Sequence, residues 1–91
     1  MSRWDAATRS LRRKVLEQVV RLGTTETNWW TTRHRVAYAL KTDPVELYSA
    51  VRLLIEEGDV ESNSLDLYDL RATLRGWMKF PKLGYENTPS R

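Results

Sequence analysis

The sequence contains no cysteine and a single histidine, His34. Disulfide bonds, thiolate metal sites and cysteine nucleophiles are therefore excluded, and one chain cannot supply a histidine cage for a metal. No apolar run approaches the roughly 18 residues that span a membrane, and the first residues lack the apolar segment of a signal peptide. These absences predict a cytoplasmic protein that carries no metal, cofactor or membrane anchor.

The charges are unevenly distributed along a chain that has the length of one small domain. The 91 residues include 15 Lys+Arg and 12 Asp+Glu, for a net charge of +3. Residues 43–69 hold eight acidic residues and one basic residue, net −7, whereas residues 1–22 hold six basic and two acidic residues, net +4. Residues 70–91, with five basic and one acidic residue, are again net +4. Such segregation indicates separate surfaces that attract partners of opposite charge.

The amino-terminal part has the apolar spacing of a helix. Leucines and valines recur every three or four residues, which predicts a helix over about 6–22, with Asp5 as its N-cap and Gly23 as its stop. The following β-branched and aromatic residues end in Asn28-Trp29-Trp30, which suits a short strand or an ordered loop. We expect the two tryptophans to pack in the core rather than to stack on nucleotide bases.

Two further helices follow, joined by the tight turn Lys41-Thr42-Asp43. Thr31 or Thr32 can cap a helix of about 32–40. Asp at the N-cap, Pro at N1 and Glu at N3 predict that a third helix begins at Pro44 and runs to about residue 57. Its predicted inward stripe consists of Leu47, Ala50, Val51 and Leu54.

Beyond the third helix the period changes to the alternation typical of strands. Residues 59–71 predict a β-hairpin in which Asn63-Ser64 offers turn chemistry and Leu65, Leu67 and Asp69 share one side. Residues 73–78 favour a helical turn, followed by an extended tail. The chain thus divides into a domain over residues 1–71 and an extension over residues 72–91.

The order of helix, short strand, helix, turn, helix and hairpin predicts an α+β fold. The stretch from Val36 to Val60, and above all the join Leu54-Ile55-Glu56-Glu57-Gly58-Asp59-Val60, resembles the winged helix-turn-helix superfamily, over about residues 8–71. This resemblance implies DNA binding, with the third helix in the major groove and the hairpin wing beside it. The residues that it assigns to DNA are Thr31, Thr32, Arg33, Arg35, Val45, Tyr48, Ser49, Arg52, Asn63 and Ser64.

The sequence does not decide which of these residues contact DNA. Wings that bind DNA usually carry Arg or Lys, whereas this one is surrounded by carboxylates, which repel phosphate. Arg52 could read guanine or pair with Glu56 one turn away. The cluster Arg9, Arg12, Arg13 and Lys14 fits equally a phosphate clamp that supplies the missing positive potential and a solvated helix face.

The tail is too apolar to remain free in solvent. Trp77, Met78, Phe80, Leu83 and Tyr85 lie within nine residues, and they either cover the domain's own core or dock on another subunit. Because small winged-helix regulators often dimerise through flanking segments, we expect a homodimer formed through the first helix and this tail.

Two functions from different classes follow. The first is a sequence-specific duplex DNA-binding protein, either a transcriptional regulator or an accessory factor of a phage or plasmid. The alternative is a protein-interaction module that uses the acidic third-helix and wing surface and binds no DNA. An enzyme is not expected, because the chain has no phosphate loop, nucleophile–base pair or metal-ligand spacing, and His34 is expected to be a surface residue.

Overall fold

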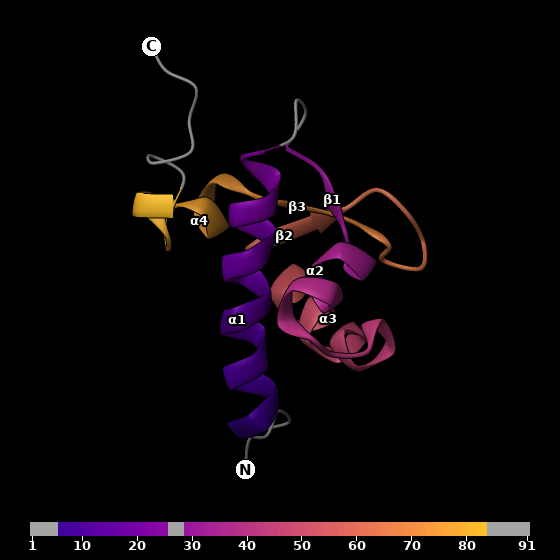
Figure 1. Cartoon of the computed structure of the whole chain (residues 1–91). Helices are drawn as coiled ribbons and strands as arrows, with labels where there is room; N and C mark the ends of the chain where they lie inside the picture. Colours follow the sequence, from indigo (N-terminus) through magenta and orange to yellow (C-terminus); the bar gives the residue numbers. More distant parts are fainter. Residues whose placement is uncertain (1–5, 26–28, 84–91) are drawn as a thin grey trace.

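A long amino-terminal helix forms the axis of the molecule, and the other elements pack along it (Figure 1). This computed structural model describes residues 6–25 and 29–83. The predicted cap Asp5, Asn28 of the predicted first strand, and Tyr85 of the tail lie outside the described residues. In chain order the elements are α1 (Ala6–Gly23), β1 (Thr31–Thr32), α2 (Arg33–Leu40), η1 (Pro44–Leu47), α3 (Tyr48–Glu56), β2 (Val60–Ser62), β3 (Asp69–Ala72) and α4 (Leu74–Trp77).

The starts of the second and third helices follow from their capping residues. Thr32 is extended, and its hydroxyl oxygen accepts a hydrogen bond from the Arg35 backbone N–H at 3.1 Å, so α2 begins at Arg33. Asp43 accepts from the Val45 N–H at 2.8 Å, which starts the next helix at Pro44 as predicted. Its first turn, η1, is nevertheless 3₁₀ rather than α-helical, and Glu46 accepts from the Thr42 hydroxyl instead of closing a capping box on the backbone.

The three strands form one antiparallel sheet in the order β1-β3-β2. β3 is central: Leu70 lies opposite Thr31 of β1 and also opposite Ser62 of β2. The hairpin is therefore confirmed, but the predicted strand over residues 65–70 is wrong, because residues 63–68 form a loop and β3 begins only at Asp69. For the segment ending in Trp30 the sequence left a short strand or an ordered loop open; Trp29 and Trp30 lie in a loop, and the first strand is Thr31–Thr32.

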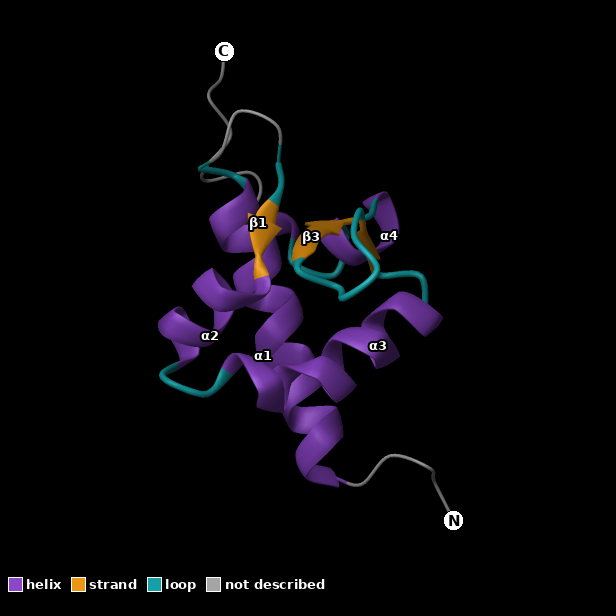
Figure 2. Ribbon diagram, turned by 90° about the vertical axis from the view of Figure 1, so that its right-hand side faces the viewer, coloured by secondary structure: helices purple, strands orange, loops and turns teal. Residues whose placement is uncertain are grey.

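The core lies where α1, α2, α3 and the sheet meet, as Figure 2 shows from the side. The predicted inward stripe of the third helix is confirmed, since all four of its members are buried. Burial of this apolar surface is the main favourable term in folding. The buried cluster consists of Val15, Leu16, Val19, Val20, Val36, Ala37, Leu47, Ala50, Val51, Leu54, Val60 and Leu70.

The segment after β3 folds back against α1 rather than extending away from it (Figure 1). Thr73 caps the predicted helical turn, accepting from the Gly76 N–H at 3.2 Å. The Thr73 N–H and hydroxyl also donate to the carbonyl oxygens of Asp59 and Gly58, at 3.0 and 2.6 Å. These bonds attach α4 to the turn between α3 and β2.

Candidate nucleic-acid interface

The outer side of η1 and α3 is the part of the third helix that the fold leaves uncovered. Val45 is 74% exposed and Tyr48 is 37% exposed, and Ser49 and Arg52 are exposed as well. The Arg52 guanidinium lies 3.9 Å from the Glu56 carboxylate, one turn further along, and its side chain remains 56% exposed. A pair this long and this exposed contributes little to stability, so Arg52 can exchange Glu56 for another acceptor.

Arg33, assigned to DNA by the sequence, joins three parts of the chain. Its two terminal guanidinium nitrogens donate to the carbonyl oxygens of Pro44 and Asp66, at 3.1 and 3.2 Å. Its guanidinium also lies over the Tyr48 ring, 5.6 Å from the centroid. These two bonds give Arg33 a positioning role between α2, η1 and the hairpin loop. Each terminal nitrogen carries a second N–H, so the phosphate contact assigned to Arg33 from sequence stays a prediction.

The remaining sequence-assigned residues near the start of α2 differ in their access to solvent. Thr31 is 2% exposed, and its hydroxyl has no hydrogen-bond partner within the described part of the chain. Its burial in β1 removes it from any surface that a nucleic acid could touch. The Thr32 hydroxyl is occupied as the helix cap, whereas Arg35 is exposed and can reach outward.

The hairpin loop over residues 63–68, called here the wing loop, is folded by its own polar groups. Ser64 Oγ accepts from the Tyr68 N–H at 2.9 Å and from the Asp69 N–H at 3.3 Å. Asp66 Oδ1 also accepts from the Tyr68 N–H, at 3.2 Å. Of the two hairpin residues that the resemblance assigned to DNA, Ser64 is thus engaged inside the loop, and Asn63 is exposed. Leu65 is fully exposed at the tip, which the sequence placed in a strand.

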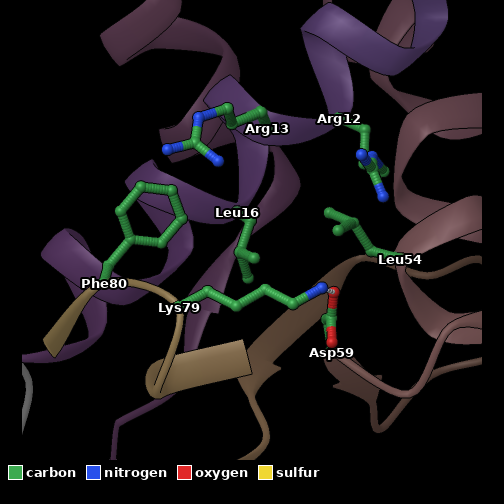
Figure 3. A pocket seen from close by; sticks show the side chains of 7 residues that line it. All are labelled: Arg12, Arg13, Leu16, Leu54, Asp59, Lys79 and Phe80. Carbon is green, nitrogen blue, oxygen red and sulfur yellow. Dashed lines mark hydrogen bonds and ion pairs between the residues drawn. The ribbon is translucent and has the colours of Figure 1, made fainter. Parts of the chain in front are cut away.

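In the predicted basic cluster on α1, two arginines contact other parts of the chain and the two remaining basic residues are exposed. Arg12 makes a close ion pair with Glu57, through contacts of 2.7 and 2.8 Å to the two carboxylate oxygens. The Arg13 guanidinium lies 5.1 Å from the centre of the Phe80 ring, as Figure 3 shows. Arg9 and Lys14 are exposed on α1. Arg12 and Arg13 therefore hold α1 to the end of α3 and to the tail.

Just beyond the carboxyl end of α3 lies a buried carboxylate that the sequence did not predict. Asp59 is 0% exposed, and one of its oxygens accepts from Arg75 Nε at 3.2 Å. The other accepts from Lys79 Nζ at 2.7 Å, as Figure 3 shows. Two cations compensate for the removal of this charge from water. The partners are 16 and 20 residues away, and no local pattern signals such a pairing.

The tail residues assigned to a dimer contact mostly touch their own chain. The Trp77 and Trp29 ring centroids are 4.6 Å apart, and Phe80 and Leu83 pack against the core cluster. Met78 is 67% exposed and Leu74, one turn earlier, is 77% exposed. The sequence left open whether this segment covers its own core, and for Trp77, Phe80 and Leu83 it does.

Comparisons with known proteins do not assign the chain to a family. No protein-family model, curated protein or solved structure matches the chain. Within residues 6–25 and 29–83, no three histidine, aspartate or glutamate side chains gather in a way that could hold a metal ion. Over the same residues, no helix combines the length and apolar character needed to cross a bilayer.

Proposed function

We propose that this chain is a winged helix-turn-helix protein that binds duplex DNA in a sequence-specific manner, as a transcriptional regulator or as an accessory factor of a phage or plasmid. The observation that carries the proposal is the uncovered outer side of η1 and α3 beside a hairpin. The topology supports it, because β1 lies between α1 and α2 in sequence and pairs with the second hairpin strand. In such a fold the third helix can enter a major groove while the loop lies alongside it.

Three side chains on the outer face of α3 have the chemistry for such contacts. Arg52 can donate two hydrogen bonds to guanine O6 and N7. The Ser49 hydroxyl can bond to a base edge or to a phosphate, and the Tyr48 hydroxyl can donate to a phosphate. The Arg33 guanidinium packs on the face of the Tyr48 ring, and this contact restricts the position of the ring in the absence of DNA.

The carboxylates near this surface reduce its affinity for phosphate, but local hydrogen bonds engage several of them. Asp43 accepts from the Val45 N–H, Glu46 from the Thr42 hydroxyl, and Asp66 from the Tyr68 N–H. Arg35 and Lys41 are exposed on and next to α2 and contribute positive potential. We therefore expect modest non-specific affinity, with selectivity that depends on α3.

The test is binding to duplexes selected from a random pool, measured by electrophoretic shift at low and moderate salt. Affinity should fall steeply with salt, because bound phosphates release their counterions. Arg52→Ala should weaken binding to the selected site by about 1–3 kcal/mol and leave binding to random duplex nearly unchanged. Arg21→Ala is the matched control, since Arg21 also pairs with a glutamate one turn away and is 47% exposed, but lies on α1.

One observation favours a second candidate, a protein-interaction module without DNA binding. The wing loop presents a fully exposed leucine, Leu65, directly next to Asp66. An apolar anchor next to a carboxylate fits a basic protein partner better than it fits phosphate. Absence of a shift at every salt concentration would support this second function, and equal losses in the two arginine variants would contradict a reading role for Arg52.

A further inference from the structure

The outer face of α2 carries an exposed aromatic side chain that the fold does not use. Tyr38 is 87% exposed, the most of any aromatic residue in the described part of the chain. It lies in the second half of α2, and α2 lies on the side of the molecule opposite to α3 in Figure 2. An exposed tyrosine has a large apolar ring and one polar group, the combination enriched where proteins bind each other.

Tyr38 stands between two shallow hollows, and it lines both of them. The hollow on its amino-terminal side is also lined by Leu22 of α1 and by His34, Arg35 and Ala39. The hollow on its carboxyl-terminal side is also lined by Ala37, Lys41, Thr42 and Asp43. A projecting side chain beside a hollow of its own chain has the shape of a surface that fits a copy of itself.

The carboxyl-terminal hollow offers suitable chemistry for a tyrosine. Its floor is apolar at Ala37, and the methylene stem of Lys41 can cover the face of a ring. Asp43 Oδ1 is occupied by the Val45 N–H, so Oδ2 can accept a hydrogen bond from a phenol. A tyrosine entering this hollow would therefore bury its ring and also satisfy its hydroxyl.

The charges along α2 also complement each other across a two-fold axis. Arg35 lies near the amino end of the helix and Asp43 lies just beyond its carboxyl end. When two such helices pack antiparallel, the arginine of each copy approaches the aspartate of the other. The dipoles of the two helices then also oppose each other, which favours the same arrangement.

The exposed apolar surface of the α4 region lacks this charge complementarity. Leu74 and Met78 of the α4 region are flanked by Arg75, Lys79 and Lys82. A two-fold axis through that surface would bring cations together, and like charges at an interface are unfavourable. The α2 surface differs in that Asp43 lies beside its cations Arg35 and Lys41, so that a second copy can pair opposite charges there.

We propose that this chain forms a two-fold homodimer through α2, in which Tyr38 of each copy enters the hollow between Ala37 and Asp43 of the other. The interface replaces the one expected from sequence, through α1 and the tail. The dimer places Arg35 and Lys41 at its interface rather than at a DNA surface, and it is tested by oligomeric state alone, without any measurement of DNA binding.

Sedimentation equilibrium of the purified full chain over a wide concentration range tests the proposal. The wild-type chain should dimerise, and Tyr38→Ser should weaken the dimer by about tenfold or more, because it removes the central side chain of the interface. Leu65→Ser is the matched control, since Leu65 is also a highly exposed apolar residue, at 102% against 87% for Tyr38, but lies in the wing loop. Asp43→Asn should weaken the dimer less, because asparagine keeps the helix cap and loses only the charge.

Cross-linking gives a second readout that does not rely on removing Tyr38. The chain has no cysteine, so Ala39→Cys introduces a single thiol on the outer face of α2. A short bifunctional maleimide should join two copies of this variant, and it should fail to join copies of the Ala39→Cys/Tyr38→Ser double variant. A wild-type chain that stays monomeric, a dimer that Tyr38→Ser leaves intact, or a dimer that Met78→Ser disrupts instead would each overturn the proposal.

Discussion

The two ends of the third helix are built in opposite ways. At the carboxyl end, Glu57 pairs with Arg12, and Asp59 is buried between Arg75 and Lys79, so segments distant in sequence are joined there. At the amino end, Val45 and Tyr48 face solvent, and the capping bonds are local. The carboxyl end of α3 is thus held by ion pairs between distant segments, whereas at the amino end Arg33 bonds to the Pro44 carbonyl from the inner side and the outer side stays uncovered. This is the arrangement expected of a helix that presents its first turns to a partner.

The largest loss of stability should come from adding a side chain where α4 packs against the turn that follows α3. A Cβ on Gly76 would overlap the backbone carbonyl of Asp59, and backbone at that place cannot give way cheaply. Gly76→Ala should therefore lower the free energy of unfolding by about 3 kcal/mol or more, measured by urea denaturation. Leu74→Ala in the same helix is the control, because its side chain is 77% exposed. Equal effects of the two variants would contradict the close packing of α4.

A smaller loss is expected when the buried carboxylate is removed. Asp59→Ala leaves Arg75 and Lys79 without an acceptor, but both cations are partly exposed and can turn to water. We expect a loss of about 2 kcal/mol in the free energy of unfolding, less than for a pair whose members are both buried. Asp69→Ala is the comparison, since Asp69 is a half-buried carboxylate in β3. If the two substitutions cost the same, the contrast between the two ends of α3 loses its energetic basis.

The smallest of the three effects should follow from Arg33→Ala, at the open end. It removes two hydrogen bonds from a charged donor to the carbonyls of Pro44 and Asp66, worth about 1–2 kcal/mol for a half-buried group. Hydrogen exchange of the wing-loop amides should speed up together with this loss. Arg33→Lys should not restore slow exchange, because one ammonium group cannot reproduce the guanidinium fork. Unchanged wing-loop exchange in Arg33→Ala would argue against a positioning role.

Sequence reasoning succeeded where the cause of structure is local. The helix caps at Thr32 and Asp43, and the buried stripe of α3, follow from residues a few positions apart. It failed in the wing loop, where alternating leucines imitate a strand. There the side chains of Ser64 and Asp66 bond to nearby backbone N–H groups, and Leu67 takes a left-handed conformation with φ of 59°. These local bonds compete with strand pairing, so β3 begins only at Asp69.

The candidate site was predictable in part. The outward positions of α3 follow from helical periodicity, and Val45, Tyr48, Ser49 and Arg52 are indeed exposed. The roles of Arg33 and Asp59 were not predictable, because each depends on groups that only the folded chain brings close. Arg33 meets a carbonyl 33 residues away, and Asp59 meets an ammonium 20 residues away.

The wing loop has a further consequence for binding. Its serine and aspartate bonds exist before any partner arrives, so the loop has already lost much of the conformational freedom that association would otherwise remove. Ordering a flexible side chain on association costs about 0.5–1.5 kcal/mol, and a loop that is already ordered avoids part of that cost. A short hairpin can thereby increase its affinity for a partner through its rigidity rather than through the number of its contacts.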